Sequence, residues 1–130
     1  MLAYPPAGTM GLEIEVTEVG NGGRCVALRG RLDSQTAPIL DERLDFVLKS
    51  ATALLFDMAG LEYISSAGIR ILVKARKALE ARGGGVAVAH LQPPVRRVID
   101  ILKAVPSIDI FADDAQMDAF IERMQRQAPP

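Results

Sequence analysis

The sequence predicts an α/β fold with a mixed, mostly parallel sheet of about five strands and about four helices. A run of alternating apolar and polar residues, a glycine-rich turn and a second strand-like run predict an opening β-hairpin. Beyond the hairpin, short apolar runs alternate with amphipathic helical patterns, as in parallel sheets. The chain has 130 residues, the size of one domain. We expect that domain over 11–127, between a flexible arm at 1–10 and a frayed tail at 128–130.

The hairpin is predicted over residues 12–32. In the run LEIEVTEV (12–19), apolar residues alternate with polar ones, which is the period of a half-buried strand. The segment GNGG (20–23) suits a tight turn because glycine and asparagine tolerate positive φ. RCVALRGRL (24–32) then returns as the antiparallel partner. The first two strands are therefore expected to be neighbours.

A helix, a strand and a second helix are expected next. Side-chain oxygens that can cap a helix precede Pro38, which fits a first turn. The capping candidates are Asp33, Ser34 and Thr36. ALLFDM (53–58) predicts a buried strand, and GLEYISSAG (60–68) a turn into a helix over 67–82. Glycines that directly follow this helix predict its end.

The C-terminal part repeats the strand and helix alternation. GVAVAHL (85–91) predicts a strand, and PPVRRVIDILKAV (93–105) a helix that begins at proline. SIDIF (107–111) predicts a fifth strand. DDAQMDAFIERMQ (113–125) predicts a last helix, whose first-turn aspartates favour its dipole. The expected order is β-β-α-β-α-β-α-β-α.

Composition excludes several classes of function. With 15 Lys and Arg against 16 Asp and Glu, and 5% aromatic residues, a nucleic-acid binder is not expected. One cysteine cannot form an intrachain disulfide, and one cysteine with one histidine cannot supply the four ligands of a structural zinc site. No signal peptide or membrane-spanning run is recognisable. We expect a cytoplasmic protein that is not an enzyme and holds no metal or cofactor.

The residues most often involved in catalysis are isolated from one another. His90, the single histidine, ends a predicted strand, and no G-x-S-x-G elbow accompanies it. Cys25 lies in an apolar strand and is expected in the core. The glycines at 83–85 follow a helix instead of preceding one, which argues against a nucleotide loop.

The segment LEYISSAGIR (61–70) is the most informative. Ser65 and Ser66 stand where an amphipathic helix begins. Serine is a favoured N-cap, yet a hydroxyl there should be solvent-accessible, and the helix dipole tolerates a phosphate. The residues alone leave a cap and a modification site open. On the same helix, Arg70, Lys74 and Lys77 form a stripe that is either a solvated face or a binding patch.

Two motifs in register resemble the STAS domain of bacterial anti-sigma factor antagonists. LRGRLDSQTA (28–37) is similar to that family's Gly-x-Leu-Asp-x-x-Thr-Ala element, and DMAGLEYISSAGIRIL (57–72) to its signature around the serine. The resemblance spans about 11–125. The matching residues of the first motif are Gly30, Leu32, Asp33, Thr36 and Ala37.

The resemblance implies partner switching. The unmodified protein would bind an anti-sigma factor that is a serine kinase, and so free a sigma factor. That kinase, using ATP bound to itself, would phosphorylate Ser66 and dissociate, and a serine phosphatase would reset the protein. Ser65 occupies a position that is often aspartate in the family and is the alternative acceptor. Ala67 replaces a common Ser or Thr.

The same resemblance places a partner surface around the serines. The implied partner-binding residues are Asp33, Ser34, Thr36, Ser65, Ser66, Ala67, Gly68, Arg70 and Lys74. An alternative is a STAS subunit of a transporter or of a stress-signalling complex that regulates no sigma factor. Neither a nucleic acid nor a membrane is an expected partner, and both a monomer and a weak dimer fit.

Overall fold

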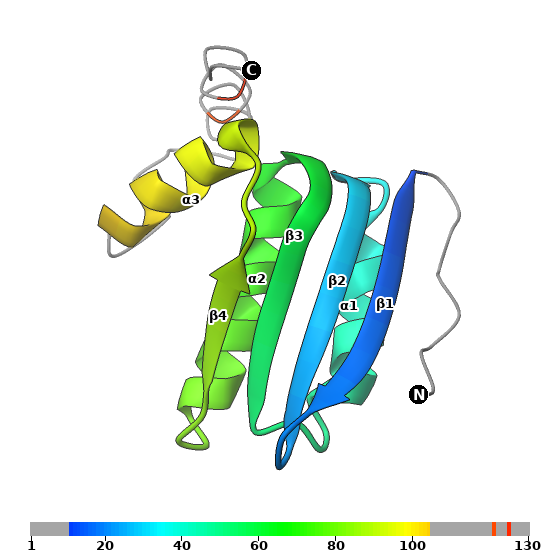
Figure 1. Cartoon of the computed structure of the whole chain (residues 1–130), viewed down its shortest axis with the longest axis vertical. Coiled ribbons are helices and arrows are strands. Elements are labelled where there is room, and N and C mark those ends of the chain that lie inside the picture. The colour runs from blue at the N-terminus through cyan, green and yellow to red at the C-terminus, as the bar shows by residue number, and fades with distance from the viewer. Residues whose placement is uncertain (1–10, 105–120, 122–124, 126–130) are drawn as a thin grey trace.

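The structure, a computed structural model, describes residues 11–104, 121 and 125. They form a mixed sheet in the order β1-β2-β3-β4, with helices α1 and α2 together behind it in Figure 1. The strands are β1 (Leu12–Val19), β2 (Gly23–Leu32), β3 (Ala53–Ile64) and β4 (Gly85–Ala89), and the helices are α1 (Ala37–Val47), α2 (Ser66–Glu80) and α3 (Pro93–Ala104).

The opening hairpin is confirmed. β1 and β2 pair antiparallel along their length, from Leu12 opposite Gly30 to Val19 opposite Gly23. The alternation in β1 has the expected result, because Leu12, Ile14 and Val16 are buried while the glutamates between them are exposed. The buried face of β1 points toward the helices.

The remaining strands are parallel, as expected. β3 lies between β2 and β4 and pairs parallel with both. The core fills the space between one face of this sheet and the two helices behind it. Its largest fully buried side chains are Phe56, Leu12, Ile14, Leu28, Leu32, Leu40, Leu44, Met58, Leu61, Ile64, Ile69 and Leu79. The other face of the sheet carries no helix in its central part (Figure 1).

The prediction of a turn over 60–68 is wrong. β3 continues to Ile64 because β2 keeps pairing with it through two register shifts, near Ala27 and Gly30. Met58, Leu61 and Ile64 are all fully buried, although they are three residues apart instead of two. The bulges change the side-chain period, so a search for strict alternation does not recognise this part of the strand. As a result the strand leads directly into α2.

The described residues hold four strands and three helices, whereas five and four were expected. The predicted strand at 107–111 lies outside the described residues, as do the arm at 1–10 and the tail at 128–130. Of the predicted last helix, Ile121 and Gln125 are described, and both are helical. No described helix combines the length and the apolar character needed to cross a bilayer.

β4 is shorter than β2, which leaves part of β3 without a neighbouring strand on one side. β4 pairs only with Ala53–Asp57, so no described strand flanks the following half of β3 on that side. The chain leaves β4 at His90, whose φ of 60° turns it away from the sheet. Two glutamine side chains bond the free edge instead. Gln92 Nε2 donates to the carbonyl of Ala59 at 2.6 Å, and Gln125 bonds Ile64.

Candidate functional site

The parallel strands β2 and β3 bring the two sequence motifs together at their carboxyl ends. Leu32 and Ile64 are opposite each other, and the backbone N–H of Ser65 donates to the carbonyl of Leu32 at 2.9 Å. The chain therefore leaves the sheet at Asp33 and at Ser65 side by side. Loops at this edge of a parallel sheet are the usual place for function.

The turn between β2 and α1 is built by Asp33 and Thr36. The backbone N–H of Asp33 donates to Thr36 Oγ1 at 2.9 Å, and the Thr36 N–H donates to Asp33 Oδ1 at 3.1 Å. Oδ1 also accepts from the N–H of Gln35, and Thr36 Oγ1 donates to the carbonyl of Arg31. This reciprocal pairing resembles a capping box that precedes the helix. Thr36 is the N-cap, but it makes no side-chain cap bond of its own.

Ser65 is the N-cap of α2, and Ser66 is its first residue. The extended backbone of Ser65 directs its Oγ to accept from the N–H of Gly68 at 3.4 Å. Both serines are buried, with 6% of Ser65 and 3% of Ser66 exposed. The expectation of a solvent-accessible hydroxyl is therefore wrong for this conformation. The sequence pattern locates a helix start correctly, but it carries no information on what packs over that start.

Gly68 allows the start of α2 to lie directly against the ends of both strands. A Cβ at this position would be 2.6 Å from Leu32 Cγ and 3.0 Å from Ile64 Cγ1. Real Cβ atoms do not approach other atoms so closely, so glycine is required for this packing. Gly68 is thus a packing residue in the described structure, and its place at a partner surface, which the resemblance implies, stays a prediction.

The solvent-facing side of the site comprises Ser34, Arg70 and Lys74, which are exposed. Asp33 and Ala67 are half-buried, and Thr36 is fully buried. Lys74 bridges the two helices, because its Nζ lies 2.9 Å from Asp41 Oδ1 and 3.6 Å from Asp45 Oδ1. The hydrogen bond and charge of Asp41 raise the pKa of Lys74. Lys74, one of the three residues of the expected basic stripe, is thus paired with carboxylates of α1.

Three residues at this edge have no counterpart in the sequence prediction. The guanidinium of Arg31 lies 4.0 Å from the centre of the Tyr63 ring, and its Nε is 3.9 Å from Asp33 Oδ2. Gln125, far away in the sequence, bonds the backbone of Ile64 next to the serines. Arg31 and Tyr63 lie within the two motifs and are paired across β2 and β3, so the pairing of these strands could have indicated them. No pattern in the sequence indicates that Gln125 contacts Ile64.

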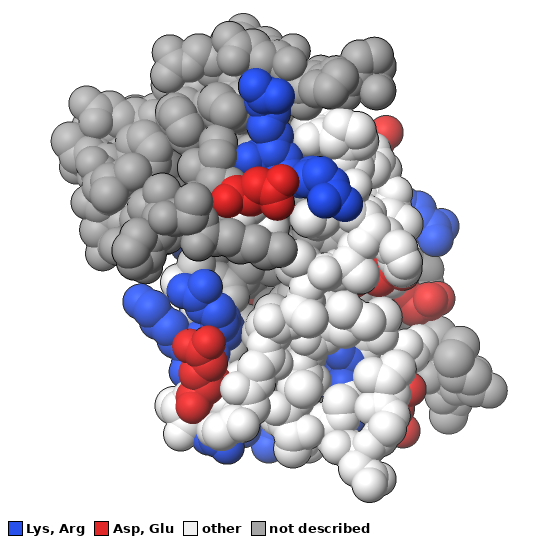
Figure 2. All heavy atoms as spheres, turned by 60° about the vertical axis from the view of Figure 1, so that its left-hand side comes forward, with Lys and Arg blue, Asp and Glu red and all other residues white. Residues whose placement is uncertain are grey.

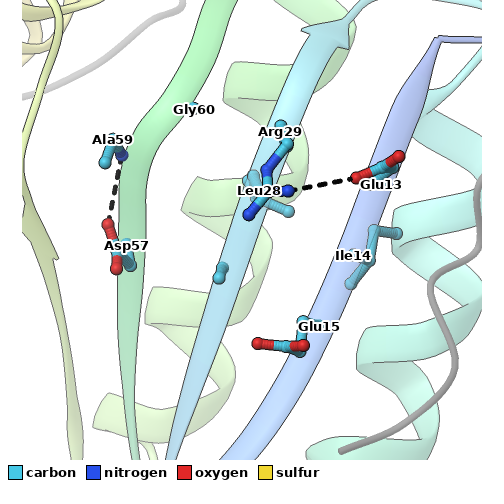
Figure 3. Close-up of a pocket in the computed structure, with 9 residues that line it drawn as sticks. Glu13, Ile14, Glu15, Leu28, Arg29, Asp57, Ala59 and Gly60 are labelled. Carbon is cyan, nitrogen blue, oxygen red and sulfur yellow. Dashed lines mark hydrogen bonds and ion pairs between the residues drawn. The ribbon is translucent and has the colours of Figure 1, made fainter.

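The open face of the sheet has a second group of charges, shown in Figure 3. Arg29 Nη1 lies 3.6 Å from Glu13 Oε2, and Asp57 Oδ1 accepts from the N–H of Ala59 at 3.1 Å. Asp57 Oδ1 is also 3.1 Å from His90 Nδ1. The Ala59 hydrogen bond and then His90 lower the pKa of Asp57. These groups satisfy one another, and the described residues contain no cluster of three or more metal-ligating side chains.

The charged side chains do not form a continuous basic surface on the face shown in Figure 2. Lys and Arg gather there in separate groups with Asp and Glu among them, beside a broad uncharged area. Nucleic-acid binding normally relies on a basic stripe that follows the phosphates. This face does not provide one.

Comparison with known proteins decides the family. The family model described as STAS domain matches residues 13–117. The chain belongs to the STAS domain family. The matched residues include the strand-to-helix junction at Ser65 and Ser66. The family that the two motifs predicted is therefore confirmed.

This STAS domain is similar to several anti-sigma factor antagonists. An anti-sigma F factor antagonist of Paenibacillus polymyxa is 28% identical over 105 residues, covering 77% of this chain and 89% of that protein. A crystal structure of an anti-sigma factor antagonist from Mycobacterium paratuberculosis has a TM-score of 0.64 at 24% identity and covers 85% of this chain and 94% of its own. The structure of the phosphorylated form of the Bacillus cell fate determinant SpoIIAA has a TM-score of 0.61 at 18% identity. It covers 72% of this chain and 86% of its own.

Proposed function

We propose that this STAS domain is an anti-sigma factor antagonist that works by partner switching. In the unmodified state it binds an anti-sigma factor with serine kinase activity, and a sigma factor is released. Phosphorylation of Ser66 ends that binding, and a serine phosphatase restores it. The similarity to proteins named anti-sigma factor antagonists supports this role. The exchange would take place in the cytoplasm, where sigma factors act.

The observation that carries the proposal is the position of Ser66. It is the first residue of α2, at the edge where β2 and β3 end and beside the Asp33 turn. A phosphate on this residue would lie at the positive end of a 15-residue helix, an interaction that is favourable by roughly 0.3–1 kcal/mol. Ser65 is the N-cap of the helix, and Ser66, which follows it, matches the acceptor position of the family motif.

The chemistry requires nothing catalytic from this chain. The Ser66 Oγ attacks the γ-phosphorus of ATP held by the kinase, and an O–P bond forms while the bond to the β-phosphate oxygen breaks. ADP leaves, and the hydroxyl proton passes to a base of the kinase. The described residues near Ser66 include no histidine, and His90 is bonded to Asp57 on the open face. We therefore propose that this protein acts as substrate and ligand.

The expected change in charge is large enough to control binding. A phosphate adds about −1.5 to −2 charges, whereas the whole chain has a net charge of −1. If the dianion is buried unpaired at the interface, its desolvation costs several kcal/mol. A loss of about 4 kcal/mol weakens binding roughly a thousandfold. The exposed rim formed by Ser34, Arg70 and Lys74 would contact the same partner.

A capture experiment tests the proposed switch. Wild-type protein, Ser66→Ala and Ser66→Asp are immobilised and offered the anti-sigma factor kinases of the source organism, each purified. Wild type and Ser66→Ala should retain one of them, and Ser66→Asp should not. Ser50→Asp is the matched control, because Ser50 precedes β3 and thus lies at the opposite edge of the sheet. Equal retention by Ser66→Asp and wild type, with both shown to be folded, would refute the switch.

A further inference from the structure

Ser66 is closed off in the described conformation, which conflicts with a role as phosphate acceptor. Only 3% of the residue is exposed, and its neighbour Ser65 is 6% exposed. Phosphoryl transfer needs the attacking oxygen within about 3–3.5 Å of the phosphorus, roughly in line with the leaving group. A kinase cannot reach the hydroxyl until the segment around it opens. The structure therefore holds Ser66 in a state that is withheld from modification.

Gln125 holds the chain two residues before this acceptor. Its Oε1 accepts from the backbone N–H of Ile64 at 3.0 Å, and its Nε2 donates to the carbonyl of Ile64 at 2.9 Å. The same Nε2 lies 3.4 Å from the carbonyl of Ile121, one helical turn earlier. All three contacts are buried, and Gln125 itself is 8% exposed.

The pairing follows from the shape of the sheet. The N–H and C=O of Ile64 point away from β2, toward the side where β4 would continue, but β4 pairs no further than Asp57. A side-chain carboxamide has the same donor and acceptor as a peptide group and takes the place of the missing strand. Without it, both buried groups of Ile64 lose the partners that the structure gives them. The contact therefore forms or breaks as a unit.

We propose that Gln125 is a latch, a positioning residue that keeps Ser65 and Ser66 buried while it holds Ile64. When the carboxamide leaves Ile64, the end of β3 is released, and Ser66 becomes accessible to the kinase. The inference rests on the proposed function for its consequence, but the latch itself is a property of the free protein. By population shift, phosphorylation then depends on the fraction of molecules in which the latch is open.

The test uses the full chain with Gln125→Met, which keeps the length of the side chain but removes both hydrogen bonds. Gln92→Met is the matched control, because Gln92 also donates an amide to β3, at Ala59. Hydrogen exchange is followed by mass spectrometry without any kinase. Exchange over 64–66 should be faster in Gln125→Met by about tenfold or more, while β1 and β2 keep their protection. Gln92→Met should leave 64–66 unchanged.

The second readout is phosphorylation by the kinase that wild type binds, with ATP. Gln125→Met should lower KM at least about threefold and leave kcat unchanged, because only the competent fraction rises. Loss of folded protein would instead raise KM. If Gln125→Met does not stay folded, Gln125→Asn provides the milder change, since it shortens the reach by one methylene. If exchange over 64–66 is unchanged, or phosphorylation is slower, the latch is wrong. If wild type is not phosphorylated, the proposed function fails, and the exchange result alone decides the latch.

Discussion

Replacement of Gly68 by alanine should destabilise the protein, although alanine is the better helix former. The helix propensity gains about 1 kcal/mol. Against this, the new Cβ would lie 2.6 Å from Leu32 Cγ, 2.8 Å from Leu32 Cδ2 and 3.0 Å from Ile64 Cγ1. An ordinary contact begins at 3.4 Å, so Leu32 would have to withdraw by about 0.8 Å. Leu32 and Ile64 are both fully buried, and because protein interiors are close-packed, such a shift would displace their core neighbours as well.

Overpacking of this kind costs about 1–3 kcal/mol. The free energy of unfolding of Gly68→Ala should therefore fall by up to about 2 kcal/mol. In a domain of this size, each kcal/mol lowers Tm by roughly 4 °C. Urea unfolding followed by circular dichroism measures it. Leu32→Ala removes the clashing atoms, so the double variant should be more stable than the sum of the single effects by at least about 0.5 kcal/mol. Strict additivity, or a Gly68→Ala variant that is more stable than wild type by the full gain in helix propensity of about 1 kcal/mol, would refute the close packing that sets the start of α2.

Three further predictions concern the site and the open face of the sheet. Asp33→Ala should cost about 1–2 kcal/mol of stability, as loss of a cap does, whereas Asp33→Asn keeps an acceptor for the N–H of Thr36 and should cost less; urea titration compares them. Ser65→Ala should cost about 0.5–1 kcal/mol, because the cap bond of 3.4 Å is long; thermal unfolding checks it. Asp57 has a lowered pKa, so its ionised form stabilises the fold above the ordinary pKa of 3.8, and the advantage is lost as the pH falls through the folded-state value. Asp57→Asn should therefore lower the free energy of unfolding at pH 6 by less than about 1 kcal/mol, since solvent screens the contact between Asp57 and His90. The difference in stability between wild type and Asp57→Asn should shrink at pH 3.

The hairpin and the alternation of strands with helices along the chain could be predicted from the sequence because each depends on a local period. Alternation in β1 and the glycine-rich turn specify the first pairing, and the apolar run of β3 specifies a buried strand. The extension of β3 to Ile64 could not be predicted, because β3 contributes an extra residue at each of two register shifts against β2. An extra residue interrupts the alternation of the strand that contains it, so β3 does not show one continuous period of two.

The start of a helix at Ser65 and Ser66 was predicted from the sequence, but the surroundings of these serines were not. The pairing of Asp33 with Thr36 explains the spacing of the first motif, and Ser65 is the cap that its position suggested. The burial of Ser66 could not be predicted, nor could the bonds between Gln125 and Ile64. Residues 64 and 125 are 61 positions apart, and no spacing rule connects a glutamine in a helix with the end of a distant strand.

The most direct test of the account is the site and consequence of phosphorylation. The complex of the wild-type protein with its anti-sigma factor kinase is incubated with ATP, the modified peptide is sequenced by mass spectrometry, and the complex remaining is measured over the same time. We predict phosphate on Ser66, release of the kinase in step with its incorporation, and neither event in Ser66→Ala. Phosphate on Ser65, or a complex that persists after Ser66 is fully modified, would contradict the account.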